Sequence, residues 1–234
     1  MPILQYHQLD KVLRNSFSRI FTNLFSPIAP TIAWYFESSL NDHFGIYNGT
    51  SQGNLTYGVG RNGCGKCLNL TLSLQQSVLV NVTPYIDLRL ISFSVEAWIK
   101  PTINVTDGLE HIILGQCAQL AIRKCMRASI GTPGVMSFLF RSDTLTDSQL
   151  IPIDVWSHVA YVYNLTALTM SLYLNGSLQV STGGHGPYQG VPSPFEIGNV
   201  ARYGYLYFSG CIDEISFYPF PRTAEEIVAT FQQG

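Results

Sequence analysis

The chain has 234 residues, of which 46% are hydrophobic and only 12% are charged, and its formal net charge is −2. This balance excludes a general electrostatic attraction to nucleic acid or to anionic membranes. The length suits one large β domain, and the low charge with many Tyr, Phe, Thr and Ser residues is typical of β proteins.

The N-terminal segment predicts an amphipathic helix over residues 8–25. Apolar residues recur there at helical spacing, and Pro27 and Pro30 would end the helix. We interpret residues 1–30 as a tail packed on the main domain, with a membrane-surface or partner-binding helix as the alternative. No stretch of about 20 mostly apolar residues predicts a transmembrane span, and the start shows no clear signal peptide.

From Thr31 onward the patterns are those of strands. Val95, Ala97 and Ile99 alternate with Glu96 and Trp98. The other expected strands cover residues 31–38, 136–142, 156–164 and 211–218, and residues 169–181 form a hairpin that turns at Asn175–Gly176. A short helix follows, with Thr223 as N-cap and Glu226 completing a capping box. These signals predict an all-β, antiparallel two-sheet jelly-roll sandwich over residues 31–234.

A glycine-rich segment at residues 58–67 resembles a nucleotide-binding loop but lacks its context. Gly58, Gly60 and Gly63 have the spacing of such a loop, yet an alternating, strand-like segment follows where a helix is needed. We therefore interpret the segment as a surface loop.

Five cysteines leave one thiol free or paired between chains. Cys117 and Cys125 lie across an expected hairpin, so we expect them to pair. Cys211 is expected to pair with either Cys64 or Cys67. Cys64 and Cys67 have no second cysteine pair, so a zinc site is not expected.

Seven Asn-x-Ser/Thr sequons indicate glycosylation in a secretory compartment. Their asparagines are Asn48, Asn54, Asn69, Asn81, Asn104, Asn164 and Asn175. Together with the cysteines, they predict an extracellular or secreted domain, or the ectodomain of a larger protein.

Two polar sets are candidate ligand sites. Arg123, Lys124, Arg127 and Arg141 would suit sulfated or acidic glycans, unless they only solvate a hairpin edge. Calcium requires several oxygen ligands, and Asp107, Glu110, Asp143 and Asp147 lie in loop-like segments that could converge on such an ion.

Asp213 and Glu214 form an adjacent acid pair on the last strand. Two close carboxylates are the equipment of a glycoside hydrolase. Adjacent strand residues point to opposite faces, so without a bulge the two acids cannot meet one substrate. In that register Asp213 shares a face with Ile215 and Phe217. We expect Asp213 to be a structural acid, and Asp213→Asn to lower thermal stability.

The order of these segments resembles the laminin G-like jelly roll of the concanavalin A-like lectin/glucanase superfamily, which is related to the pentraxins. The segments are "IAWYFESSLND" (32–42), "FSVEAWIKP" (93–101), "WSHVAYVYN" (156–164), "LYLNGSLQ" (172–179), "FEIGN" (195–199) and "GCIDEISFYPFPRTAEEI" (210–227). The resemblance implies two stacked antiparallel sheets in an extracellular module that binds glycans, proteins or calcium, mostly without catalysis. The E-x-D-x-x-E motif of the glucanases and the pentraxin calcium cluster are not evident.

These observations predict a non-catalytic extracellular recognition or adhesion module for a glycan or protein ligand. One alternative is a glycoside hydrolase or lyase of the same fold with an unrecognised acid pair. A second is a structural or oligomerisation module that uses the N-terminal helix and the spare cysteine. The sequence does not specify the oligomeric state.

Overall fold

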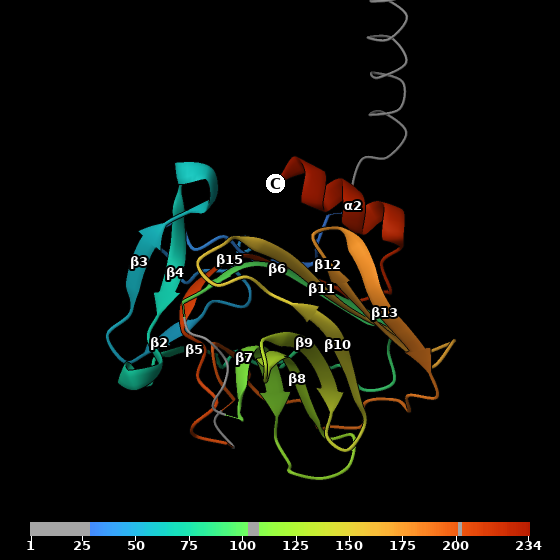
Figure 1. Ribbon diagram of the computed structural model, residues 1–234. Helices are drawn as coiled ribbons and strands as arrows, with labels where there is room; N and C mark the ends of the chain where they lie inside the picture. The colour runs from blue at the N-terminus through green and yellow to red at the C-terminus, as the bar shows by residue number, and fades with distance from the viewer. Residues whose placement is uncertain (1–28, 103–107, 201–202) are drawn as a thin grey trace, which may run out of the picture.

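A computed structural model of the chain describes residues 29–102, 108–200 and 203–234. The described residues form two antiparallel sheets stacked face to face, with the helix α2 on the outer side of one of them (Figure 1). We call the sheet beneath α2 the front sheet and the other the back sheet. This arrangement confirms the predicted two-sheet jelly-roll sandwich.

The front sheet has the strand order β13-β12-β11-β6-β15-β4-β3, and β1 also pairs with β15. Its strands are β1 (Ile32–Trp34), β3 (Thr56–Val59), β4 (Lys66–Leu70), β6 (Phe93–Pro101), β11 (Ser157–Asn164), β12 (Thr169–Leu174), β13 (Ser177–Gly183) and β15 (Gly210–Tyr218).

The back sheet has the order β10-β9-β8-β7-β14-β5-β2. Its strands are β2 (Thr50–Gln52), β5 (Ser77–Val80), β7 (Glu110–Cys117), β8 (Cys125–Gly131), β9 (Val135–Phe140), β10 (Thr144–Leu150) and β14 (Phe195–Ile197). Short 3-10 turns cover Arg61–Gly63 and Leu72–Leu74.

Aromatic side chains from both sheets fill the space between the layers. The ring of Phe93 on β6 lies 6.0 Å from Phe138 and 5.9 Å from Phe140, both on β9, and all three are buried. Tyr163 on β11 and Phe217 on β15 extend the cluster to neighbouring strands. Burial of such large rings is the main source of stability for a sandwich of this size.

The alternation along β6 has the predicted register. Val95, Ala97 and Ile99 face the core between the sheets. Glu96 and Trp98 lie on the other face, yet they too are buried, because α2 covers that face. A charged side chain and an indole are therefore held beneath a helix.

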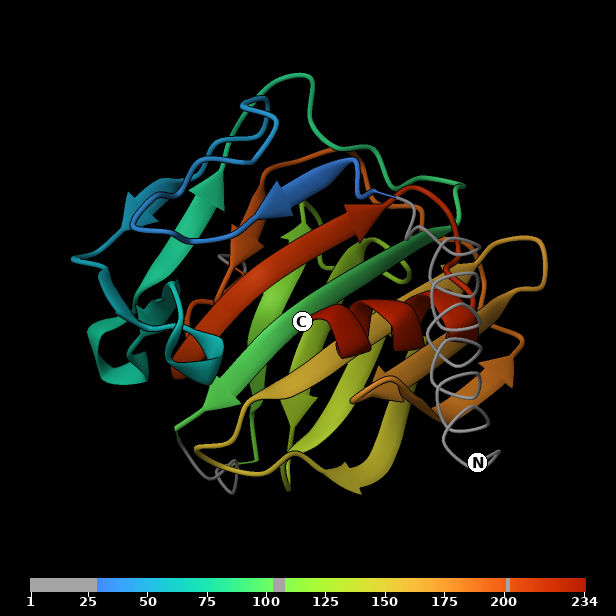
Figure 2. The ribbon, with the colours of Figure 1, turned by 90° about the horizontal axis from the view of Figure 1, so that it is seen from above.

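The helix α2 (Ala224–Gln233) begins at the predicted capping box. The Thr223 backbone N–H donates to Glu226 Oε2, and the Glu226 N–H donates to Thr223 Oγ1. Ile227 packs in one buried cluster with Ala160, Val162 and Tyr173 on β11 and β12. The helix thus lies across the outer face of the front sheet (Figure 2).

Two local features differ in how well the sequence predicts them. The hairpin turns at Asn175 (φ 49°) and Gly176 (φ 77°), as a type I′ turn requires. The expected strand over residues 31–38 is shorter than predicted, and β1 ends at Trp34 because Phe36 (φ 51°) and Ser38 (φ 56°) leave the extended conformation.

The predicted helix over residues 8–25 lies outside the described residues. In the part of the chain that the structure describes, no helix is long and apolar enough to cross a membrane.

Candidate functional site

A pocket of about 380 Å³ opens on the outer face of the front sheet, beside the C-terminal end of α2. We call it the α2 pocket. Strands β6, β11 and β15 form its floor, and the last turn of α2 and the turn Arg61–Gly63 contribute walls. The residues used below are Tyr35, Arg61, Glu96, Trp98, His158, Glu214 and Tyr218.

A buried network of polar and charged side chains lies at the floor of the α2 pocket. Arg222 Nη1 lies 2.8 Å from Glu96 Oε1, and His158 Nε2 lies 3.3 Å from Glu96 Oε2. All three side chains are buried. Arg222 also donates to the Glu226 carbonyl (2.7 Å), so the network fastens α2 to β6. Burial, together with the Glu96 carboxylate, raises the pKa of the adjacent Tyr218 to about 12, so this phenol stays neutral.

Trp98 is held between a cation and an aromatic ring. The guanidinium carbon of Arg61 lies 4.2 Å from the centroid of the indole, and the ring of Phe231 stacks at 5.7 Å. Among the described residues, neither the buried indole N–H of Trp98 nor Arg61 Nε has a hydrogen-bond partner. Buried donors of this kind are normally satisfied by water or by a ligand.

A β-bulge on β15 changes the predicted placement of the acid pair. The pairing of β15 with β6 shifts between Asp213 and Ser216, and Glu214 has a φ of 48°. Ile212 and Ile215 both enter the core, so the two acids between them stay on the outer side. The expectation that Asp213 shares a face with Ile215 and Phe217 is therefore wrong, because the extra residue of the bulge reverses the alternation.

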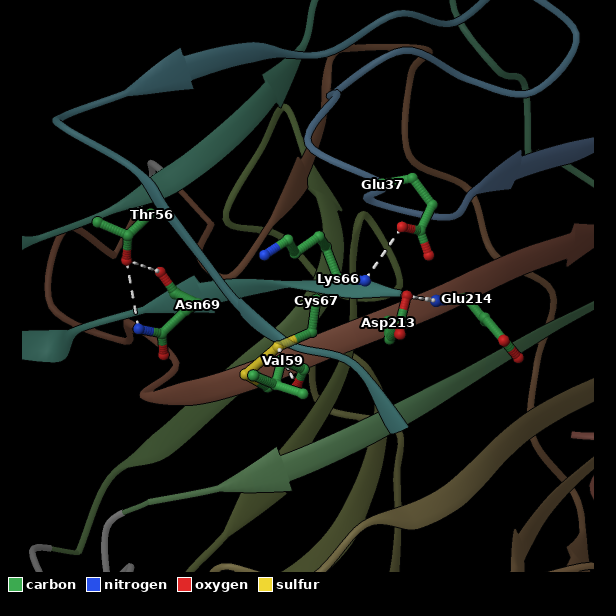
Figure 3. The surroundings of a disulfide bond; sticks show 9 residues. Glu37, Thr56, Val59, Lys66, Cys67, Asn69, Asp213 and Glu214 are labelled. Atoms are coloured by element: carbon green, nitrogen blue, oxygen red, sulfur yellow. Dashed lines mark hydrogen bonds between the residues drawn. A yellow bond between two sulfur atoms is a disulfide. The ribbon is translucent and has the colours of Figure 1, made fainter. Parts of the chain in front are cut away.

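The two acids differ in environment. Asp213 is buried, and its Oδ1 accepts the Glu214 backbone N–H at 2.9 Å (Figure 3). Burial first, and then the charges of Glu214 and Glu37, raise the pKa of Asp213 to about 7. Glu214 is more exposed, lines the α2 pocket and lies 3.7 Å from Arg61 Nη2.

The structure separates the predicted basic cluster into two groups. Arg127 lies over the ring of Tyr203 (4.3 Å) and pairs with Glu110, while Arg141 donates to the Tyr203 hydroxyl (2.7 Å). Arg123 and Lys124 lie instead on the loop between β7 and β8, where Arg123 pairs with Asp143 at 3.0 Å.

The described members of the predicted calcium set do not converge. Glu110 pairs with Arg127. Asp143 accepts hydrogen bonds from Arg123 and the Gly186 N–H and lies 2.6 Å from His185 Nδ1. Asp147 accepts the N–H groups of Ser148 and Gln149. Asp107 lies outside the described residues. Within the described ranges, no three His, Cys, Asp or Glu residues gather in a way that could hold a metal ion.

Two disulfides form, and they resolve the open pairing. Cys117 pairs with Cys125 as expected, and Cys211 pairs with Cys67 rather than Cys64. Cys64 is exposed and free. A Cβ at Gly58 would lie 3.0 Å from both sulfur atoms of the Cys67–Cys211 bridge, so a side chain at this position would crowd the bridge.

None of the described sequon asparagines is buried. Asn54, Asn81 and Asn175 are exposed, and Asn48, Asn69 and Asn164 are half-buried. Asn104 lies outside the described residues. The six described sequons therefore remain candidate glycosylation sites.

The sequence pattern did not identify the α2 pocket. One local signal was present, since Glu96 and Trp98 share the non-core face of β6. Arg61, His158 and Glu214 come from three other segments, and only the folded topology places them with β6.

Comparison with known proteins gives one family and a group of similar folds. Residues 75–228 match the laminin G-like model described as the concanavalin A-like lectin/glucanases superfamily. The comparison with curated protein sequences found no match to the chain.

Among solved structures, the chain is similar to domain 4 of AbnA, an extracellular GH43 arabinanase from Geobacillus stearothermophilus that was solved in complex with arabinotriose. The TM-score is 0.65 and the sequence identity is 19%, and the match covers 86% of this chain and 97% of that domain. The binding domain of Paraclostridial Mosquitocidal Protein 1 has a TM-score of 0.68 at 18% identity, over 88% of this chain and 52% of that one.

The receptor-binding domain of botulinum neurotoxin mosaic serotype C/D has a TM-score of 0.65 at 18% identity, over 88% of this chain and 51% of that one. The chain thus spans about half the length of these toxin domains. At these identities the likeness establishes the fold. Since the family model covers more than half of the chain, the protein belongs to the concanavalin A-like lectin/glucanase superfamily, as a laminin G-like jelly roll.

Proposed function

We propose that the chain is a non-catalytic extracellular recognition module that binds a glycan in the α2 pocket. The observation that carries the proposal is the set of polar groups around Trp98. Two buried donors without a partner among the described residues, on Trp98 and Arg61, lie near the carboxylate of Glu214. Sugar hydroxyls both donate and accept hydrogen bonds, so they match this mixture.

The charges of the pocket favour a neutral sugar over an acidic one. Glu96 is paired with Arg222, and Glu214 lies near Arg61. These pairs leave no net positive charge for a carboxylate or a sulfate. Tyr35, which is 38% exposed, adds an aromatic ring on which a sugar can pack.

Two further observations support the extracellular glycan-binding reading. The structurally similar arabinanase domain was solved with arabinotriose bound. The two disulfides and the accessible sequons suit an oxidising compartment with N-glycosylation. Secretion of the chain, together with a gel-mobility shift on glycosidase treatment, would support an oxidising, N-glycosylating compartment. A chain whose mobility does not shift would count against that compartment.

A glycan array of neutral, sialylated and sulfated sugars tests the ligand class. We expect neutral glycans to bind, and Glu214→Gln to weaken the binding about tenfold, since a hydrogen bond to a charged group contributes about 1.5–3 kcal/mol. Tyr35→Ala should also weaken binding. Tyr205→Ala is the matched control, because Tyr205 is an exposed tyrosine outside the pocket.

Three results would count against the proposed site. Binding confined to sulfated or acidic glycans, and lost on substitution of Arg141, would assign recognition to the basic residues. Binding abolished by a calcium chelator would show that recognition depends on an ion rather than on the α2 pocket alone. Equal binding by wild type and the Glu214→Gln variant would exclude the α2 pocket.

The bulge on β15 favours glycoside hydrolysis as a second candidate function. Asp213 and Glu214 lie on the same side of the strand, and the pKa of Asp213 is raised to about 7, a value that suits a general acid. Incubation of bound glycans followed by product analysis separates the two functions. Cleavage lost in Asp213→Asn and in Glu214→Gln would establish the enzyme, and an intact glycan would support the recognition module.

A further inference from the structure

The loop of residues 118–124, between β7 and β8, presents aliphatic side chains to solvent. Leu120 is 44% exposed and Ile122 is 65% exposed. The disulfide between Cys117 and Cys125 closes the base of this loop. Exposed aliphatic side chains grouped on one loop mark an interaction surface more often than isolated ones do.

Hydrogen bonds fix the backbone of the loop. The Arg123 N–H donates to the Arg141 carbonyl (2.9 Å), and the Gln189 N–H donates to the Arg123 carbonyl (2.7 Å). The Lys124 N–H closes a turn on the Ala121 carbonyl (3.0 Å). Because the backbone is held at its base and along one side, little conformational entropy is lost when the tip meets a partner.

The charges around the tip are basic. Residues 118–124 contain Arg123 and Lys124 and no acid. The nearby carboxylate of Asp143 is engaged by Arg123 and His185. In the described part of the chain Lys124 makes no ion pair, so its ammonium is available to an anionic partner.

We propose that this loop docks on a lipid bilayer that contains anionic headgroups, with Leu120 and Ile122 inserted at the interface and Lys124 against the headgroup phosphates. Aliphatic side chains beside cations are the chemistry of interfacial membrane binding. A stable protein interface needs about 800 Å² on each partner, which two side chains do not supply. The net charge of −2 gives no general attraction to such a surface, so the contact is local.

Vesicle flotation of the full chain tests the proposal. The probes are phosphatidylcholine vesicles with and without phosphatidylserine. We expect binding to the vesicles with phosphatidylserine that falls as salt is raised, because salt screens the contact between Lys124 and the headgroups. Ile122→Ser should weaken this binding about tenfold, since the variant loses most of the apolar area of one aliphatic side chain. Lys124→Glu should weaken it several-fold, and only with phosphatidylserine present.

Leu178→Ser is the matched control, since Leu178 is 52% exposed on β13 and lies outside the loop. It should float like the wild type. These exposed positions carry little folding energy, and equal melting temperatures confirm that each variant is folded. No flotation with either vesicle would overturn the proposal. Flotation unchanged by Ile122→Ser combined with Leu120→Ser would overturn it equally.

Discussion

Asp213 is a buried carboxyl group whose protonated form is favoured by the fold. Its folded pKa is raised to about 7, whereas the pKa of an unfolded aspartate is about 3.9. Between these two pH values the folded state binds more protons than the unfolded state. Asp213 therefore costs stability as the pH rises through this window, and above about pH 7 the full cost is present.

Because ionised Asp213 costs stability, Asp213→Asn is expected to stabilise the protein above about pH 7, not to destabilise it as the strand pattern alone suggests. Asparagine cannot ionise, and its Oδ1 can still accept the Glu214 N–H. At about pH 3.5, below the pKa of Asp213 in both the folded and the unfolded state, the variant should melt close to the wild type. At pH 8 it should melt higher by at least about 2–4 °C, which corresponds to about 1 kcal/mol in a chain of this size. Thermal melts at both pH values check this.

Glu214→Gln serves as the control for these melts, because the Glu214 side chain is 42% exposed whereas Asp213 is buried. It should show no comparable pH-dependent gain. A lower melting temperature for Asp213→Asn at both pH values would support the purely structural role that the strand pattern suggests, and would contradict the burial argument.

At the scale of elements, the attachment of α2 to β6 shapes the α2 pocket. Arg222 and Glu96 form a fully buried pair whose two side chains are 0% and 1% exposed. Removing one partner of such a pair leaves an uncompensated buried charge and costs about 3–5 kcal/mol. The helix and the pocket wall that it provides therefore depend on this pair.

Glu96→Gln should destabilise the protein by about 3–5 kcal/mol and loosen α2. The matched control is Asp87→Asn, which breaks the exposed pair between Asp87 and Arg89 and should cost less than about 1 kcal/mol. Urea unfolding measures both losses, and hydrogen exchange of α2 amides reports the loosening. Equal losses in the two variants would show that the buried pair does not hold the helix.

The sequence predicts those elements whose sequence signals lie in neighbouring residues. The register of β6, the turn at Asn175–Gly176 and the cap of α2 at Thr223 follow from neighbouring residues, and all are confirmed. The bulge at Glu214 is not predictable in this way, because a glutamate gives no sign of a positive φ.

The α2 pocket was less predictable than the sheets for a related reason. Arg61 and His158 lie far apart in sequence and meet Trp98 only through the strand order of the front sheet. The resemblance predicted the superfamily and the two layers, but its binding sites vary between members, so it predicted no particular pocket.

At the scale of the whole molecule, the two disulfides close loops of very different length. Cys67 and Cys211 are 144 residues apart and join β4 to β15, whereas Cys117 and Cys125 are 8 apart. In the chain-entropy view, a bridge over a longer loop restricts the unfolded chain more.

Replacing both Cys67 and Cys211 by serine should therefore cost about 4–5 kcal/mol, and replacing Cys117 and Cys125 should cost less. Urea unfolding of the two double variants compares them. Cys64→Ser leaves both bridges intact and is the control. If Cys64 joins two copies, a covalent dimer on non-reducing gels disappears in this variant, which tests the oligomerisation alternative. A larger loss for the Cys117–Cys125 pair would contradict the loop-length argument.

The most direct test of the proposed glycan site is the indole N–H signal of Trp98 in a ¹⁵N NMR titration with the array-selected glycan. Trp34 is an internal reference, because its Nε1–H is already bonded to the Tyr47 carbonyl at 3.0 Å. Trp98→Phe assigns the signal. We expect the Trp98 signal to shift and saturate while the Trp34 signal stays in place. Saturable glycan binding with an unmoved Trp98 signal would contradict it.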